Sequence, residues 1–331
     1  MGKIVDSFLF FQELDLLEIR LQYLDPYVDL FIISEAGQTF SGLPKSFLFE
    51  ENQDRFAKFL PKIRYQKIID THQSYDSVIS HLANLSTPSA RVVCEILQAH
   101  THYPKSKLHW VLDTYHRESL HIAYEKYVDA DDFLFFSDLD EIPSSLVFSS
   151  KNLEKLDQLL LVCQQDEFRY FLNYYKDSDW LGTIGSKYKN IKAKSLNSLR
   201  IDSKSKRSII DETPITKGGW HFTSCGGISA IRKKIEGWGH QEFNNSTVLN
   251  NLEKNIAQGK DIFYRDVGQN LKIVRADDQR FFDESMSKLL GNYPALIADN
   301  INRFERSSKW GDYLAIFCLN LRKIREKLFK R

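Results

Sequence analysis

Three carboxylates within four residues suggest a cation or phosphate site in the middle of the chain. Residues 135–143 read FFSDLDEIP, in which Asp138, Asp140 and Glu141 follow an apolar run. Two aspartates at positions i and i+2 around a bend can both reach one hard cation, if a kink or a water redirects one of them. A solvated acidic turn is the alternative. The apolar run before the carboxylates and Pro143 after them favour the metal site.

The segment that leads into these carboxylates is predicted to be a buried strand. A polar turn at 128–132 precedes the apolar residues 133–136, as is typical of an inner strand of an α/β sheet. The carboxylates then fall at the carboxyl end of the strand, where open α/β sheets bind their ligands.

The first half of the chain alternates strand and helix patterns, which predicts a parallel sheet. Strands are expected at 3–11, 28–34 and 63–69, and helices at 13–24 and 111–127, with a polar surface excursion at 72–89.

The second half is less regular. We expect a helix at 153–162, an aromatic strand at 167–175 and loops to about 216, followed by GGWHFTSCGG at 218–227. No internal repeat is evident. The organisation predicted is one catalytic domain over 1–312, with a nucleotide-side half at about 1–143 and an acceptor-side half at about 144–312.

Charge and composition exclude several classes of protein. The 45 lysine and arginine residues nearly balance the 44 aspartate and glutamate residues, which argues against a nucleic-acid partner. The four cysteines have no zinc or redox spacing. Neither a long apolar stretch nor a signal peptide is evident, so a soluble, cytoplasmic protein is expected, with peripheral membrane contact as an option.

That option rests on residues 313–331, a basic stretch with apolar residues at steps of three and four. This pattern predicts an amphipathic helix. It can dock on the catalytic domain, or it can attach to an anionic membrane that holds a lipid-linked saccharide acceptor.

Three further side chains are candidates for binding a nucleotide. Glu35 follows the strand predicted at 28–34, where a doubly wound sheet can offer a carboxylate to a nucleoside; a charged loop residue is the alternative. His116 and Arg117 lie on the helix before the acidic strand, and an arginine there can bind a phosphate with two hydrogen bonds. The alternative is an arginine paired with Glu118 or with solvent.

Several stretches together resemble glycosyltransferase family 17, best known for bisecting N-acetylglucosaminyltransferases. They are FLFFQELDLLEIRL, ISEAGQTFSGLPKSFLFEEN, FSDLDEIP, WLGTIGSKYKNIK, GGWHFTSCGG, IEGWGHQEFNN and GKDIFYR. The resemblance implies a GT-A type, Rossmann-like mixed sheet flanked by helices. It also implies a UDP-linked nucleotide-sugar donor, a carbohydrate acceptor and Mn²⁺ or Mg²⁺ held by the D-x-D element. The family's eukaryotic members carry an amino-terminal anchor that this sequence lacks.

The resemblance also suggests roles for individual residues. Asp140 is expected to ligate the metal directly, Asp138 to reach the ribose or the metal, and Glu141 to lie behind them or contact the sugar. A late histidine often completes the metal site of a GT-A fold, so His221 is expected to be a third ligand, with His240 as its competitor.

Transfer with inversion requires a general base near the acceptor hydroxyl, normally a carboxylate. Glu242 and Asp179 are the two candidates. Trp180, Trp220 and Trp238 are candidates for stacking on sugars, although each alone is more often a core or rim residue.

Two other functions remain open. One is a carbohydrate-binding protein that keeps the transferase scaffold without catalysis. The other is a phosphohydrolase that uses D-x-D as nucleophile and acid. That chemistry usually places a hydroxyl residue two positions after the motif, where this chain has Ile142.

Overall fold

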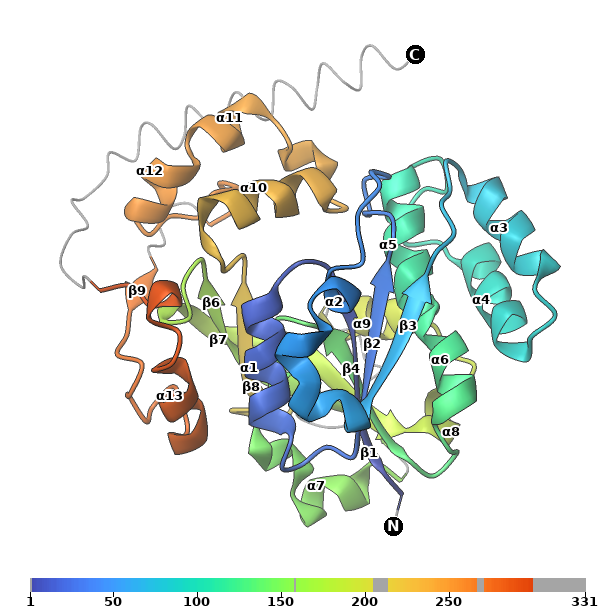
Figure 1. Cartoon of the computed structure of the whole chain (residues 1–331), viewed down its shortest axis with the longest axis horizontal. Coiled ribbons are helices and arrows are strands. Elements are labelled where there is room, and N and C mark those ends of the chain that lie inside the picture. The colour runs from blue at the N-terminus through green and yellow to red at the C-terminus, as the bar shows by residue number, and fades with distance from the viewer. Residues whose placement is uncertain (1, 158, 205–213, 267–270, 300–331) are drawn as a thin grey trace.

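A single mixed sheet organises the protein (Figure 1). The computed structural model describes residues 2–157, 159–204, 214–266 and 271–299. Within them the sheet has nine strands in the order β3-β2-β1-β4-β7-β6-β8-β5, and β9 pairs with β7. The first four are parallel: β1 (Ile4–Phe10), β2 (Leu30–Ala36), β3 (Ile63–Ile68) and β4 (Phe133–Asp138).

The second half adds antiparallel pairs to this parallel sheet. Its strands are β5 (Glu141–Pro143), β6 (Leu161–Arg169), β7 (Tyr174–Lys187), β8 (Gly219–Thr223) and β9 (Lys272–Ile273). β7 is antiparallel to β4 and β6, whereas β8 is parallel to β6 and antiparallel to β5. The sheet therefore continues from the first half of the chain into the second.

Helices cover the sheet and its ends. Those of the first half are α1 (Leu14–Leu24), α2 (Leu48–Glu51), η1 (Gln53–Lys62), α3 (Tyr75–Asn84), α4 (Pro88–Ala99), α5 (Leu108–Glu118) and α6 (Leu120–Tyr127). Those of the second half are η2 (Ser145–Phe148), α7 (Ser150–Lys155), α8 (Tyr188–Ile191), α9 (Leu196–Lys204), α10 (Gly227–Gly237), η3 (Gln241–Phe243), α11 (Ser246–Asn250), α12 (Leu252–Ala257), α13 (Glu284–Leu290) and η4 (Pro294–Leu296).

The two faces of the sheet bury alternate residues of the same strands, as the two-residue period of a strand requires. In β4, Phe133 and Phe135 pack in the cluster that includes α1, η1, α7 and α13. Leu134 and Phe136 pack in the opposite cluster, with α6, α8 and α9. Figure 1 shows α3 and α4 beside α5 at one end of the sheet, and α10 to α12 together near its other half. The inner strands are thus buried on both faces.

Several sequence-based expectations need correction. The helix expected at 153–162 ends with α7, and β6 begins at Leu161. The strand expected at 167–175 is a hairpin in which β6 turns into β7, and the expected loops contain β7 to α9. The surface excursion at 72–89 contains α3, and 111–127 is split between α5 and α6. In these segments, tertiary packing rather than the local pattern of apolar residues determines the secondary structure.

The predicted fold class is confirmed: the sheet is mixed, Rossmann-like and flanked by helices. In the part of the chain described, no helix combines the length and apolar character needed to cross a bilayer. The amphipathic helix predicted at 313–331 lies outside the described residues.

Candidate functional site

A buried arginine fixes the backbone of the acidic turn. Arg20, on α1, is fully buried and donates two hydrogen bonds to Asp6 of β1, at 2.6 and 2.8 Å. Its Nη1 donates to the carbonyl oxygens of Asp138, Leu139 and Glu141 at 2.9 to 3.1 Å. One guanidinium group therefore ties α1 and β1 to the turn that follows β4.

Asp138 lies between two arginines. Its Oδ1 accepts from Arg117 Nη1 at 2.6 Å, and its Oδ2 accepts from Arg200 Nη2. Burial alone would raise the pKa of Asp138, but the two guanidinium groups lower it to about 2. The carboxylate is therefore ionised at neutral pH, and both its oxygens already have cationic partners.

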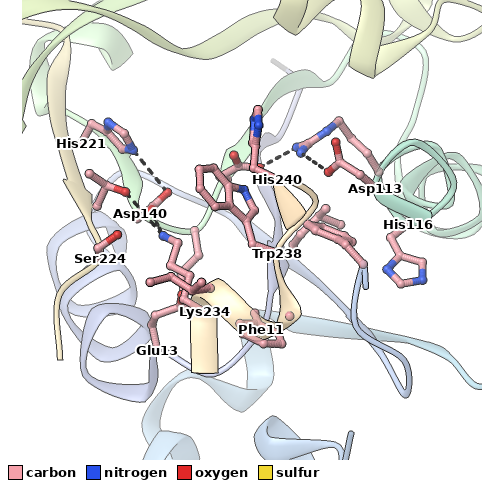
Figure 2. Close-up of a pocket in the computed structure, with 18 of the residues that line it drawn as sticks. Phe11, Glu13, Asp113, His116, Asp140, His221, Ser224, Lys234, Trp238 and His240 are labelled. Carbon is pink, nitrogen blue, oxygen red and sulfur yellow. Dashed lines mark hydrogen bonds and ion pairs between the residues drawn. The ribbon is translucent and has the colours of Figure 1, made fainter. Parts of the chain in front are cut away.

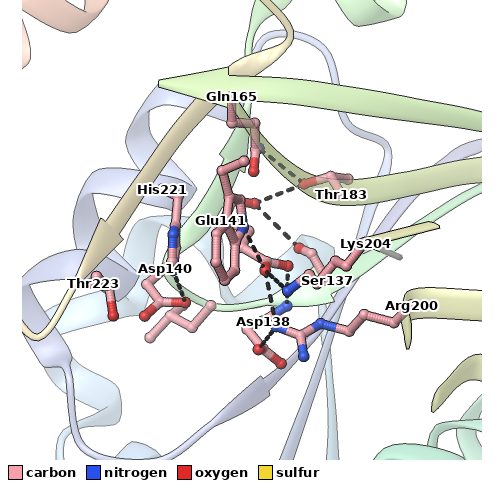
Figure 3. A network of polar contacts seen from close by, with 12 residues as sticks. Ser137, Asp138, Asp140, Glu141, Gln165, Thr183, Arg200, Lys204, His221 and Thr223 are labelled. Carbon is pink, nitrogen blue, oxygen red and sulfur yellow. Dashed lines mark hydrogen bonds and ion pairs between the residues drawn. The ribbon is translucent and has the colours of Figure 1, made fainter. Parts of the chain in front are cut away.

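Glu141 lies behind the turn and gathers basic side chains (Figure 3). It is fully buried, and its Oε1 accepts from Arg200 at 2.9 Å, from Lys204 at 3.1 Å and from the Trp180 ring nitrogen at 2.9 Å. Burial opposes ionisation, yet Arg200 and Lys204 lower the pKa of Glu141 well below its ordinary value. Glu141 thus holds the side chains of Arg200 and Lys204 beside the turn.

Helix α9 brings Arg200 and Lys204 to the turn, and its first turn is held by Glu118. The buried carboxylate of Glu118 accepts from the backbone N–H groups of Leu196 and Asn197 at 3.0 and 2.9 Å. A carboxylate at a helix N-terminus satisfies free N–H groups and complements the helix dipole. The adjacent Arg117 binds Asp138 directly. Helix α5 therefore positions both of the arginines that contact Asp138.

Asp140 has different partners from Asp138. Lys234 of α10 donates to its Oδ2 at 3.0 Å, and His221 Nε2 lies 3.7 Å from its Oδ1. The His221 ring stacks on Trp180, with centroids 4.0 Å apart and an interplanar angle of 19°. Figure 3 shows Asp138 with Arg200 and Asp140 with His221 on separate sides of the turn.

The local sequence explains how His221 reaches this place. Strand β8 pairs with β5 and β6, so His221 lies between Glu141 and Glu167 in register. Gly219 has φ of 135°, and a Cβ atom there would lie 2.1 Å from the carbonyl oxygen of Ile142. Only glycine permits this close approach of β8 to β5.

The predicted metal ligands fit a cation only in part. Among the residues described, Asp138, Asp140 and His221 do not form a group whose ligand atoms all lie within 4.8 Å of one another. Asp140 and His221 do form a pair. Their separation of 3.7 Å is too long for a hydrogen bond and leaves room for an ion about 2.1 Å from each.

A cavity of about 740 Å³ opens at the carboxyl edge of β1, β2 and β4 (Figure 2). Its volume suits a small-molecule or cofactor site. Among the residues described, eight basic ones line it: Lys45, Arg117, Arg169, Lys176, Arg200, Lys204, Lys234 and Arg265. Seven acidic residues do so as well: Glu13, Asp113, Asp138, Asp140, Glu167, Asp261 and Asp266. The described part of the lining therefore carries one formal positive charge more than negative charges.

Aromatic rings line another part of the cavity. Trp110 stacks on Tyr103, with centroids 4.3 Å apart, and meets His240 edge-on at 4.7 Å. Trp238 lies 4.4 Å from His240. In Figure 2, Trp238 and His240 lie between Asp140 and Asp113. Such rings provide apolar faces for sugars or bases.

His116 and Arg117 both line the cavity, as the sequence suggested. Burial lowers the pKa of His116 to about 3, so its ring is neutral at physiological pH. Its Nε2 is buried without a hydrogen-bond partner, which leaves it available to a ligand. Arg117 is paired with Asp138 and Asp113, rather than with Glu118 or solvent.

The structure does not bring Glu35 to the cavity lining. Its carboxylate faces α2, opposite the cavity-lining Ser34 and Ala36, and accepts from the backbone of Leu48 at 2.7 Å and from Tyr65 at 2.7 Å. Glu35 also binds Lys45 at 2.5 Å. Through these contacts Glu35 stabilises the start of α2.

The two predicted general bases lie outside the lining. Asp179 is exposed on β7. Glu242 accepts a 2.8 Å hydrogen bond from Nδ1 of His240, which does line the cavity. Of the three tryptophans proposed for sugar stacking, Trp180 and Trp238 line the cavity, whereas Trp220 is buried in the core.

Sequence reasoning missed much of the basic lining. Arg200 and Lys204 lie in a stretch expected to be loop, and nothing in the local pattern marked Lys234. Glu13 was also missed. It lines the cavity, and burial raises its pKa despite the nearby Lys234. The signal for Glu13 was its place directly after the first predicted strand.

Comparison with known proteins finds one family whose model matches the start of the chain. Residues 1–84 match glycosyltransferase family 17. The amino-terminal quarter of the chain is therefore similar to the family 17 glycosyltransferases. The predicted resemblance is thereby confirmed over these residues, which contain β1, α1, β2, β3 and α3.

Two other comparisons add little. No curated protein matches the chain. The crystal structure of a 4-diphosphocytidyl-2C-methyl-D-erythritol synthase is similar at a TM-score of 0.28 and 12% identity, over 62% of this chain and 85% of that one. A likeness at this level supports no conclusion about the fold or the function of this chain.

Proposed function

We propose that the protein transfers a sugar, with inversion, from a UDP-linked donor to a carbohydrate acceptor, with N-acetylglucosamine as the first sugar to test. The observation that carries the proposal is the acidic turn at the cavity edge, with Arg117, Arg200, Lys204 and Lys234 around it. Charge-assisted contacts from such side chains suit a diphosphate. The finer points, UDP, N-acetylglucosamine and inversion, rest on the resemblance.

The charge balance of the cavity favours metal dependence. A diphosphate carries at least two negative charges, whereas the lining formed by the described residues offers one unbalanced formal positive charge. Asp140 and His221 would hold Mn²⁺ or Mg²⁺, and Asp138 would stay with its arginines. When bound, the ion neutralises the leaving diphosphate as a Lewis acid. The chain's own cations contact the remaining phosphate oxygens.

His240, positioned by Glu242, is proposed to accept the proton of the acceptor hydroxyl. A carboxylate can only accept a hydrogen bond, so the contact with Glu242 places a proton on Nδ1 of His240 and leaves Nε2 as a proton acceptor. The hydroxyl oxygen then attacks the anomeric carbon, the bond to phosphate breaks, and the nucleoside diphosphate leaves with the electron pair.

The test is a donor screen. Thermal stabilisation and nucleoside diphosphate release would be measured with several nucleotide sugars, in Mn²⁺ or Mg²⁺ and in a chelator. We expect stabilisation by a UDP-sugar that requires the metal, and release that requires a saccharide acceptor. Saccharide binding without any nucleotide binding would contradict the proposal and favour the carbohydrate-binding alternative.

The affinity for UDP should fall by up to about 10-fold between pH 7 and pH 9. Burial and the neighbouring Arg200 lower the pKa of Lys204 to about 8. Lys204 is charged below this pH and neutral above it, so a rise in pH removes one cation from the diphosphate site. Calorimetric titration across this range measures the effect. Lys204→Arg stays charged and should flatten the curve, and an unchanged slope in that variant would assign the titration to another group.

A further inference from the structure

A second group of possible metal ligands lies outside the cavity. Asp70 and His72 are in the loop between β3 and α3, and His81 is on α3. His72 Nε2 lies 2.6 Å from Asp70 Oδ2, and His81 Nε2 lies 3.6 Å from Asp70 Oδ1. The three ligand atoms all lie within 4.8 Å of one another. None of these residues lines the cavity.

We propose that Asp70, His72 and His81 form a zinc site that joins α3 to the loop after β3. Two imidazoles and one carboxylate are a ligand set that Zn²⁺ accepts in a tetrahedral site, with water in the fourth position. Imidazole ligands favour Zn²⁺ over Mg²⁺, which prefers oxygen. The second imidazole distinguishes this site from the proposed Asp140 site, which offers one imidazole, that of His221.

The distances are close to those that zinc needs. Zinc-bound nitrogen and oxygen lie about 2.0 to 2.2 Å from the metal, which puts neighbouring ligand atoms of a tetrahedron about 3.4 Å apart. The 3.6 Å separation of Asp70 and His81 is already near this value. The contact between Asp70 and His72 must lengthen. The Asp70 side chain, 17% exposed, would turn to lengthen its contact with His72, which is 5% exposed, and the His81 side chain, 34% exposed, would follow it.

The surroundings hold two of the three ligands. The Tyr115 hydroxyl donates to Asp70 Oδ2 at 2.6 Å, a contact of the kind that orients metal ligands. The Gln38 side chain accepts from the backbone N–H of His72 and donates to its carbonyl oxygen, both at 2.9 Å. Gln38 itself lines the cavity. A zinc ion would therefore stabilise a loop that is bonded directly to a wall of the cavity.

The experiment is a zinc titration of the full chain after treatment with a chelator, without nucleotide, monitored by competition with a chromophoric chelator. We expect one Zn²⁺ to bind per chain and to raise the melting temperature. His81→Ala should weaken binding by at least about 10-fold. His81→Gln is a second variant, closer in polarity, for the case in which the alanine variant is unstable.

Two matched controls locate the ion. His102→Ala removes an exposed histidine outside the cluster and should leave zinc affinity unchanged. Asp140→Asn should leave it unchanged as well. No saturable binding, or equal affinity in wild type and both His81 variants, would overturn the proposal. Loss of zinc binding in Asp140→Asn but not in the His81 variants would place the ion in the cavity, which also overturns it.

Discussion

Asp140→Asn should lower the rate of sugar transfer by about 100-fold or more, with little change in the melting temperature. Asp140 lines the cavity and has Lys234 and His221 as its partners. The amide keeps the shape of the side chain but removes the negative charge, so it cannot hold a divalent cation beside His221. The measurement is the initial rate of nucleoside diphosphate release at saturating Mn²⁺.

Asp277→Asn is the matched control for this variant. Asp277 is exposed and pairs only with a surface arginine in the contacts described, Arg275. Its loss should leave the rate unchanged. Transfer at the wild-type rate in Asp140→Asn would refute the metal role of Asp140. A large drop in melting temperature would instead show that the ion pair with Lys234 holds the fold.

Arg20→Met should lower the free energy of unfolding by about 3 to 5 kcal/mol. The variant leaves the carboxylate of Asp6 buried without its cation and leaves three carbonyl oxygens of the acidic turn without their shared donor. Chemical denaturation with urea measures the change. The double variant Asp6→Leu, Arg20→Met should recover part of the loss, because no unpaired charge remains.

Arg55→Met is the comparison for an exposed arginine. Arg55 also contacts two carboxylates, those of Asp15 and Glu18, but a third of its side chain is exposed. Its replacement should cost about 1 kcal/mol or less. Equal losses in the Arg20 and Arg55 variants would show that burial of the Arg20 ion pair does not determine its contribution.

The first half of the fold was predictable because its periodic patterns are strong. Apolar runs bounded by polar turns marked β1, β2, β3 and β4, and two of the three acidic residues at the end of β4, Asp138 and Asp140, line the cavity. Asp138 could not be placed from sequence, because its arginines come from helices 21 and 62 residues away. The base role proposed for His240 could not be predicted either, since it depends on how the chain before η3 places His240 beside Trp110.

The strands of the second half were predicted poorly, because their sequences do not alternate regularly between apolar and polar residues. β7 has fourteen residues and changes from partly exposed to buried along its length, so it resembles a loop locally. β8 is recognisable only through the glycines around GWHF, and the sequence does not reveal that Gly219 lies against the backbone of β5. Long-range pairing, rather than local propensity, determines these elements.

The adjacent positions of Arg117 and Glu118 on α5 imply a mechanical linkage. Arg117 reaches the acidic turn directly, while Glu118 grips the first turn of α9, the helix that carries Arg200 to the other oxygen of the same carboxylate. Both arginines that bind Asp138 are therefore positioned by the end of one helix, α5. A substitution that shifts the end of α5 is expected to displace Arg117 and the start of α9 together, and so to disturb both contacts of Asp138 at once.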